Sequence, residues 1–396
     1  MKITAVRCHV LLDPGYDADA TSSNQDTIVV EIETDEGIVG IGETDLNAWV
    51  AKACIEAPGT HTMDRGLGQM LIGMDPLDPR ACWQELYVGT AMTGRRGAVL
   101  HALGAIDVAL WDIAGKAAGK PVWQILGTER PDAVRPYASL LPNAGDTWEA
   151  FAAALGGQAI DAAKRGYRAA KLELLTTGPY RHTGLDVEDD RLVEVIASVR
   201  EAVGADFEIM VDVGYAWTDW RYALSIIESW ADYNVFFVET PLWTDDIDGY
   251  AELVVNSPIP IAAGEWLSHS REFQQYVDRN ALDVLQPDVG RVGGLTEAIR
   301  VTELAAQRDL IVVPHGWKTG ITVAATAQLA AVTPQMPFFE FVPPDVAESR
   351  LRRELVDDEM TILPDGTLPR PIRPGIGVDL NPDAVEEFSR AARAIG

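Results

Sequence analysis

Eight ionisable side chains lie within or just past short apolar runs between residues 169 and 342 of the chain. They are Lys171, Glu173, Asp212, Glu239, Glu265, Asp288, His315 and Glu340. They recur about once per apolar run. If the runs are parallel strands of one barrel, their carboxyl ends share a rim, and these side chains converge there.

Three of the acids follow successive runs: Asp212, Glu239 and Glu265. Crowded carboxylates repel one another, and burial raises that cost. A divalent cation removes the penalty, and an all-oxygen ligand set suits Mg²⁺ with positions left for water and substrate oxygens. The alternative is three unrelated acids at helix N-termini, where carboxylates are favourable. Repetition on consecutive runs favours one Mg²⁺ per subunit.

A histidine and an aspartate end the next two runs, in the segments Gln286-Pro287-Asp288 and Pro314-His315-Gly316. An aspartate beside a histidine fixes its tautomer and raises its basicity. The pair predicts a general base. The alternative is a structural histidine at a helix end.

Two further charges lie in apolar surroundings. Lys171, in AAKLELL, needs a partner because a buried ammonium is costly. We expect Lys171 to bind an anionic carboxylate or to act as an acid or base. The alternative is a structural lysine whose apolar stem is buried while its ammonium reaches water at the barrel rim. Glu340, in FFEF, is either a protonated donor to a developing oxyanion or the partner of Lys171.

The elements that position these residues begin near residue 133. Predicted strands cover 135–140, 169–174, 207–212, 235–239, 259–263, 284–286, 310–314 and 338–342. Predicted helices between them cover 149–165, 191–203, 220–231, 271–279, 295–307 and 322–331. Strict alternation indicates parallel βαβ units. Eight strands favour a closed barrel, with an open doubly wound sheet as the alternative.

The first third has a different pattern. The runs 27–33 and 38–42 flank a turn at 35–37 and predict a hairpin, and 97–118 has helical apolar spacing. Polar, Gly-containing stretches at 14–25 and 48–66 are expected to be loops. We predict an α+β domain over 1–128, the barrel over 129–345 and a C-terminal segment, 346–396, that packs back on the first domain.

The composition of the chain disfavours some classes of binding partner. The net charge of −28 over 396 residues disfavours nucleic acid and anionic membranes. Three cysteines without CxxC spacing favour a reducing cytoplasm. We expect no run of the ~20 apolar residues that a membrane span needs. A small-molecule carboxylate and a homo-oligomer are the expected partners.

Together these features resemble the mandelate racemase branch of the enolase superfamily. That resemblance implies a capping domain and a modified TIM barrel, (β/α)7β. It also implies Mg²⁺ ligands at Asp212, Glu239 and Glu265, a His315–Asp288 dyad, and Glu340 as a donor to the enolate. The stretches 35–44 (DEGIVGIGET) and 101–127 are similar to the family's hairpin and to the segment that joins its domains.

Two positions depart from the branch. Where K-x-K is usual, this chain has Lys171-Leu172-Glu173, and where D-x-N is common it has Asp212-Val213-Gly214. Racemisation needs a base on each face, so loss of the second lysine favours dehydration, with His315 as base and then as acid.

The resemblance implies a sugar-acid substrate that becomes a 2-keto-3-deoxy acid. A racemase, epimerase or cycloisomerase on the same scaffold is the alternative, with Glu173 as an unusual second base, and a non-catalytic sugar-acid binder is a third possibility. The residues expected to bind substrate are Glu173, Tyr215, Trp266, Trp317 and Lys318. The loops at 14–25 and 48–66 are expected to close over the site.

Overall fold

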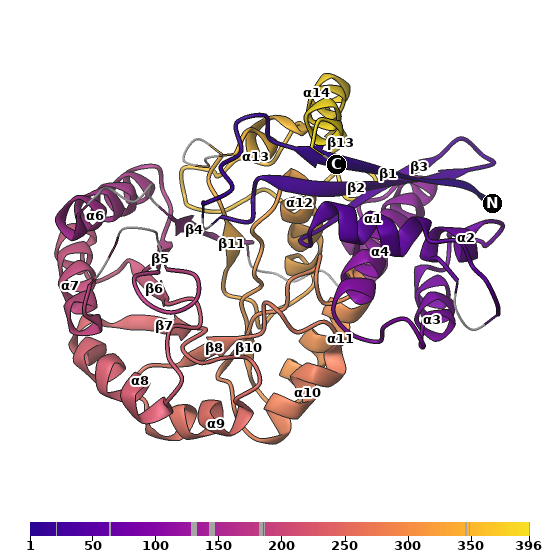
Figure 1. The fold of residues 1–396 in the computed structure, drawn as a ribbon. Coiled ribbons are helices and arrows are strands. Elements are labelled where there is room, and N and C mark those ends of the chain that lie inside the picture. Colours follow the sequence, from indigo (N-terminus) through magenta and orange to yellow (C-terminus); the bar gives the residue numbers. More distant parts are fainter. Residues whose placement is uncertain are drawn as a thin grey trace.

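The computed structural model describes residues 1–20, 22–62, 65–127, 133–141, 147–181, 185, 187–344, 347 and 349–395. Figure 1 shows a ring of helices around a strand barrel, with an antiparallel sheet and further helices against one side of it. The predicted domain boundaries at 128/129 and 345/346 both fall outside the described ranges, so they stay predictions.

Eight strands form one all-parallel sheet in the order β10-β9-β8-β7-β6-β5-β4-β11. They are β4 (Pro136–Leu140), β5 (Ala169–Glu173), β6 (Glu208–Asp212), β7 (Val235–Glu239), β8 (Ile261–Ala263), β9 (Val284–Leu285), β10 (Ile311–Val312) and β11 (Phe339–Phe341). The Glu340 amide donates to the Pro314 carbonyl at 3.1 Å, which links the last two strands. The predicted modified TIM barrel is confirmed.

Strand alternation explains why the charged residues share one face. Ala169, Met210 and Phe237 are fully buried members of one apolar cluster built from the barrel strands. Side chains of a strand repeat on one face every second residue. The same face therefore receives Lys171 and Glu173 from β5, Asp212 from β6 and Glu239 from β7. The apolar interior lies below, and the ionisable groups lie at the carboxyl ends.

Helices cover the outside of the barrel. They are α6 (Trp148–Lys164), α7 (Leu192–Val203), α8 (Trp220–Ile227), α9 (Ile247–Asn256), α10 (Ser270–Asp278), α11 (Leu295–Ala306) and α12 (Gly320–Ala330), with 3-10 turns η1 (Asp189–Arg191) and η2 (Glu228–Tyr233). The sequence prediction lacked α9. That helix is capped by the Asp246 carboxylate, which accepts the Gly249 amide, and it buries Tyr250 and Leu253 at helical spacing.

The capping region contains a three-stranded antiparallel sheet of β1 (Ile3–Leu12), β2 (Asp26–Thr34) and β3 (Val39–Thr44), which confirms the predicted hairpin. The helices are α1 (Ala48–Glu56), α2 (Leu67–Leu71), α3 (Pro79–Gly89), α4 (Ala98–Ala118) and α5 (Trp123–Leu126). Strand β3 packs tightly on α4. A Cβ atom at Gly42 would lie 2.0 Å from the Ala105 carbonyl oxygen, so only glycine fits there.

The prediction of a loop over 48–66 was wrong for residues 48–56, which form α1. Asn47 caps this helix by accepting the Val50 amide, and Ala48, Ala51 and Ile55 are buried at helical spacing. Residues 63 and 64 lie outside the described ranges.

The expectation about membrane spans also needs correction. Among the described residues, α4 is long and apolar enough to cross a membrane by length and composition. However, 89% of its most apolar window is buried inside the protein. Such burial is typical of the core helix of a soluble fold, and α4 is apolar because it packs on β3 on one side and on α11 and α3 on others.

The last part of the chain returns to the capping sheet. It contains α13 (Arg350–Glu354), the short pair β12 (Val356–Asp357) and β13 (Asp379–Leu380), and α14 (Pro382–Arg393). Helix α14 packs on β1, as Figure 1 shows in yellow above the indigo strand. Cys8, Cys54 and Cys82 are all free thiols.

Candidate active site

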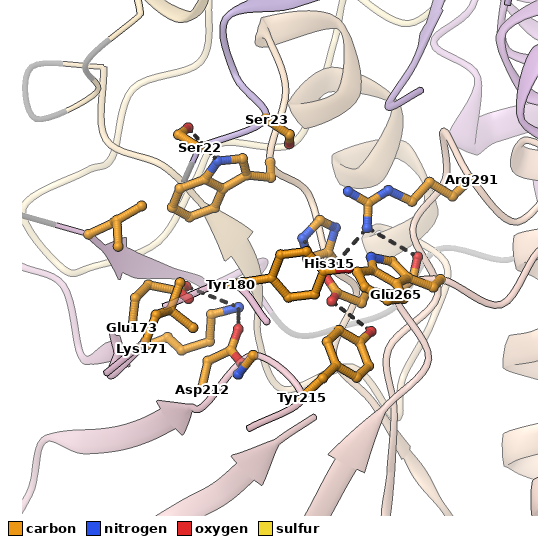
Figure 2. Close-up of a pocket in the computed structure, with 15 residues that line it drawn as sticks. Ser22, Ser23, Lys171, Glu173, Tyr180, Asp212, Tyr215, Glu265, Arg291 and His315 are labelled. Atoms are coloured by element: carbon orange, nitrogen blue, oxygen red, sulfur yellow. Dashed lines mark hydrogen bonds and ion pairs between the residues drawn. The ribbon is translucent and has the colours of Figure 1, made fainter. Parts of the chain in front are cut away.

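A cavity of about 250 Å³ opens at the carboxyl ends of the barrel strands (Figure 2). Its wall combines charged residues of the barrel with aromatic residues and with two serines of the capping region. The lining residues are Ser22, Ser23, Leu141, Lys171, Glu173, Leu175, Tyr180, Asp212, Gly214, Tyr215, Glu265, Trp266, Arg291, His315 and Trp317. Five of the eight predicted ionisable residues therefore meet at one cavity, together with Ser22 and Ser23 of the segment 14–25.

The Lys171 ammonium lies among four carboxyl groups from four strands. Its Nζ atom is 2.8 Å from Glu340, 2.9 Å from Glu239, and 3.4 Å from both Glu173 and Asp212. Burial alone would lower the pKa of Lys171, but these carboxylates outweigh it and hold the pKa well above its ordinary value. One positive charge cannot balance four negative ones, so part of the cluster must carry protons or a further cation.

The excess of negative charge in this cluster affects the pKa values of its carboxyl groups. Burial, together with neighbouring carboxylates, raises the pKa of Glu239 to about 8 and holds the pKa of Glu173 well above its ordinary value. The Ser139 hydroxyl lies 2.9 Å from Glu173 and 2.6 Å from Glu340. A single hydroxyl proton cannot serve both oxygens, and a protonated Glu173 resolves this because it can donate to Ser139.

Glu340 pairs with Lys171, which was the alternative interpretation of this residue. Burial would raise its pKa, but Lys171 and His315 bring the pKa down to about 2. Its carboxylate also accepts the Gly316 amide at 2.8 Å. The role of Glu340 as a donor to a developing oxyanion stays a prediction.

His315 and Asp288 form a close pair from the ends of β10 and β9. The Nδ1 atom of His315 is 2.6 Å from Oδ2 of Asp288, whose Oδ1 accepts the amides of Gly290 at 2.7 Å and Arg291 at 3.1 Å. Burial lowers the pKa of His315, but Glu340, Glu265 and the bond to Asp288 raise it well above its ordinary value. Asp288 is thus fixed by the backbone and in turn orients the imidazole.

Glu265 is directed away from the other two predicted metal ligands. Its carboxylate accepts the Tyr215 hydroxyl at 2.8 Å and lies 3.0 Å from Nε2 of His315 and 3.4 Å from Arg291. Asp212 instead accepts from the Gly214 amide and the Thr240 hydroxyl, both at 2.8 Å. Lys171 and the Gln286 amide hold Glu239, at 2.9 and 2.6 Å.

The described residues contain one compact group of possible metal donors, formed by Asp45, Asp288 and His315 within 4.8 Å of one another. The predicted triad of Asp212, Glu239 and Glu265 is not such a group. Asp45, however, is already paired with the cations Arg291 and Lys318. The negative charge of Asp45 in the compact group is thus already balanced by two cations. The predicted triad instead has more negative than positive charge and offers only oxygen donors, which suits Mg²⁺.

The predicted substrate-binding residues divide into two sets. Glu173, Tyr215, Trp266 and Trp317 line the cavity. Tyr215 has a positive φ of 61°, and its ring stacks on Trp266 with centroids 4.0 Å apart. Lys318 does not line the cavity; its ammonium contacts Asp45 at 3.2 Å and backbone carbonyls of the capping region.

Several residues of the site were missed from the sequence, among them Arg291, Ser139 and Asp45. Arg291 lines the cavity, Ser139 joins Glu173 to Glu340, and Asp45 of the capping region binds Arg291. Arg291 carried a usable signal, because it is a cation three residues past Asp288 in the same strand-end loop. Asp45 carried no such signal in the sequence, because its role depends on how the capping region packs against the barrel.

Two family models match the chain. The N-terminal domain of mandelate racemase / muconate lactonizing enzyme matches residues 2–127, and the enolase C-terminal domain-like family matches residues 154–384. The two matches together span most of the chain.

Curated relatives cover nearly the full length. D-galactarolactone cycloisomerase of Agrobacterium fabrum is 32% identical, over 98% of this chain and 99% of that protein. L-rhamnonate dehydratase of Saccharopolyspora erythraea is 30% identical, over 90% of this chain and 84% of that protein.

Solved structures give the same result. The 3,6-anhydro-D-galactonate cycloisomerase from Zobellia galactanivorans aligns with a TM-score of 0.83 at 28% identity, over 98% of this chain and 99% of that one. A racemase from Streptomyces coelicolor A3(2) with bound magnesium aligns at 0.81 and 26% identity, over 98% and 99%.

Proposed function

The chain belongs to the mandelate racemase / muconate lactonizing enzyme family of the enolase superfamily, and from that premise we propose that it is a magnesium-dependent sugar-acid dehydratase. The enzyme removes the proton next to the substrate carboxylate and eliminates the β-hydroxyl. The product is a 2-keto-3-deoxy acid. The observation that carries the proposal is the 2.6 Å pair of His315 and Asp288 at a buried cavity rich in carboxylates.

The residues present fit a magnesium ion by their chemistry. Asp212, Glu239 and Glu265 offer only oxygen donors, as Mg²⁺ prefers, and the carboxylates around Lys171 outnumber its single charge. These three residues would hold one ion per subunit, with the Glu265 side chain turned from its present partners. When bound, the ion supplies positive charge that stabilises the carboxylate and enediolate oxygens of the substrate.

The chain's own residues supply the remaining functions. His315, oriented by Asp288, takes the α-proton through Nε2. Lys171 lies in the cavity wall and would bind one oxygen of the substrate carboxylate, which helps to stabilise charge as it develops there. The imidazolium that results then donates its proton to the β-hydroxyl, which leaves as water. The proton taken from carbon leaves with the hydroxyl as water, and the enol that remains tautomerises to the 2-keto-3-deoxy acid.

Glu173 favours elimination over racemisation. A racemase needs a second base on the other face of the substrate, and Glu173 occupies the position expected for it. Burial and neighbouring carboxylates hold the pKa of Glu173 well above its ordinary value, which favours the protonated form of this carboxyl. The protonated form cannot accept the α-proton.

Cycloisomerisation is the second candidate, and two of the similar proteins are named cycloisomerases. It begins with the same loss of an α-proton to His315. The difference is that the leaving oxygen belongs to a ring and stays attached to the product. The mass of the substrate is then unchanged, whereas dehydration removes one water.

Mass spectrometry separates these reactions directly. The purified protein with MgCl₂ is incubated with open-chain sugar acids, including L-rhamnonate and D-gluconate, and with D-galactarolactone. We expect a semicarbazide-reactive product that has lost one water from an open-chain acid. A ring-opened product with the same mass as D-galactarolactone would support cycloisomerisation instead of dehydration. A substrate that exchanges its α-proton and gives only an epimer would overturn both.

A further inference from the structure

Lys318 is a buried cation that the proposed reaction does not use. It follows His315 by three residues and is 2% exposed. Its ammonium donates to the carbonyl oxygens of Ser23 and of Asp26, the latter at 2.7 Å. It also lies 3.2 Å from the Asp45 carboxylate and 3.5 Å from that of Asp26. All of these partners belong to the capping region.

Two of the three partners of Lys318, Ser23 and Asp26, lie in one short stretch, residues 22–26, which we name the wall segment. Ser22 and Ser23 line the cavity, while Asp26 begins β2. Residues 22–25 contain no helix or strand. Gln25 is held within the capping region, because its carbonyl accepts the Asp13 amide at 2.8 Å and its side-chain amide donates to the Asp17 carbonyl at 2.8 Å. Ser22 and Ser23 instead contact the barrel.

A second contact comes from the residue before Lys318. The indole Nε1 of Trp317 donates to the Ser22 hydroxyl at 3.1 Å. Trp317 and Ser22 both line the cavity. Two adjacent barrel residues thus hold two adjacent residues of the wall segment, and Figure 2 shows Ser22 and Ser23 above the cavity, on the side opposite Asp212 and Tyr215.

Asp45 completes the arrangement. Its carboxylate is bonded to Arg291, which follows β9, and lies near Lys318, which follows β10. The Ser23 hydroxyl donates to the same carboxylate at 3.4 Å. An ammonium is buried at low cost only when it is well paired, and here two carbonyls and two carboxylates surround it. Removing Lys318 leaves these oxygens without their donor.

We propose that Lys318 is a positioning residue that holds the wall segment as the outer wall of the substrate cavity. The same turn carries His315, so the position of the general base and the closure of the cavity are fixed together. Ser22 and Ser23 then limit the size of the substituents far from the substrate carboxylate. The proposal rests on the proposed function only in taking this cavity as the substrate site.

Hydrogen–deuterium exchange of the full chain tests the wall segment without any substrate. In Lys318→Met, exchange of the amides of residues 22–26 should rise about tenfold or more, because bonds to a charged donor are lost. Lys52→Met removes an exposed lysine of α1 in the same region and should leave these amides unchanged. Unchanged exchange in Lys318→Met would overturn the proposal.

A general rise in exchange across the barrel would mean that Lys318→Met is unfolded, and Ser22→Ala then decides. It removes the bond from Trp317 and the bond that the Ser22 hydroxyl accepts from the Asn24 amide, so exchange should rise at the other amides of residues 22–26 and not in the barrel. No change in that variant would also overturn the proposal.

Kinetics add an independent test with whichever substrate the panel identifies. Because Lys318 does not line the cavity, Lys318→Met should raise KM about tenfold or more with kcat within about threefold of wild type. A loss confined to kcat would instead make Lys318 part of the chemistry and overturn the positioning role. If no panel compound reacts, the exchange experiment still tests the wall segment, so failure of the proposed function is distinguishable.

Discussion

The Nε2 atom of His315 lies 3.0 Å from the Oε2 atom of Glu265. The first residue is the proposed base and the second a proposed metal ligand. For Glu265 to bind a cation together with Asp212 and Glu239, its carboxylate has to leave the imidazole. If this proposed site binds a cation, the same movement of the Glu265 side chain would free the basic nitrogen of His315.

Replacement of the base should abolish proton transfer but not metal binding. In His315→Asn, exchange of the substrate α-proton with deuterated water should fall by a factor of about 10²–10⁴, as followed by NMR. Titration calorimetry should still detect Mg²⁺ binding. The matched control is His9→Asn. His9 lies on β1 in the capping sheet and pairs with Glu31 of β2. Exchange at the wild-type rate in His315→Asn would remove this residue from the base role.

The ammonium of Lys171 should be essential for stability when metal is absent. Lys171→Met leaves four carboxyl groups without their shared counter-charge, and loss of one partner of a buried pair costs about 3–5 kcal/mol. Urea unfolding measures this loss. Excess MgCl₂ should restore part of it, because a second cation can take over the neutralisation.

The control for this variant is Lys164→Met on the surface of α6, where the side chain is 71% exposed. It should change stability by less than about 1 kcal/mol. An unfolding midpoint of Lys171→Met equal to that of the control, in EDTA, would contradict the role assigned to Lys171.

The barrel could be predicted because its signals are local. Short apolar runs gave all eight strands, and all but the first carry an ionisable residue at or near the carboxyl end. The two-residue repeat of a strand put Lys171, Asp212 and Glu239 on one face. The helix α1 was missed because it was grouped with the polar, glycine-containing residues 57–66 that follow it. Its burial depends on three apolar positions that pack on distant elements.

The side-chain partners within the site could not be predicted in the same way. The sequence indicated that Glu340 and Glu265 end strands, but not that Glu340 is neutralised by Lys171 or that Glu265 points to His315. These choices depend on distances between strand ends. Lys318 was predicted to bind substrate because it is close to His315 in sequence, yet its side chain turns toward the capping region.

Asp107 should make the stability of the fold depend on pH. It is fully buried on α4 and accepts the Thr296 amide at 2.8 Å and the Thr296 hydroxyl at 2.6 Å, at the start of α11. Burial raises its pKa from 3.8 to about 7. Protonation in the folded state contributes stability that is fully present below about pH 4 and is lost as the pH rises through 7.

Asp107→Asn removes that dependence. The variant should be more stable than wild type at pH 8 by roughly 2–4 kcal/mol and closer to it at pH 4, as urea unfolding at the two pH values would measure. The exposed Asp232→Asn on η2 should show no such difference. A variant that is less stable than wild type at pH 8 would mean that the charged carboxylate is favoured at this helix start.

Glu239 should release a proton when the metal binds. Burial and the carboxylates of Asp212 and Glu340 raise its pKa to about 8, against the lowering effect of Lys171, so the group is mostly protonated at pH 7. A cation needs the ionised ligand and therefore displaces the proton. Calorimetric Mg²⁺ titrations in buffers of different ionisation enthalpy should give about one proton released per ion at pH 7. The release should fall as the pH rises past 8, because Glu239 is then already ionised. Heats that do not depend on the buffer at pH 7 would show that Glu239 is already ionised without metal, which would contradict the raised pKa of this residue.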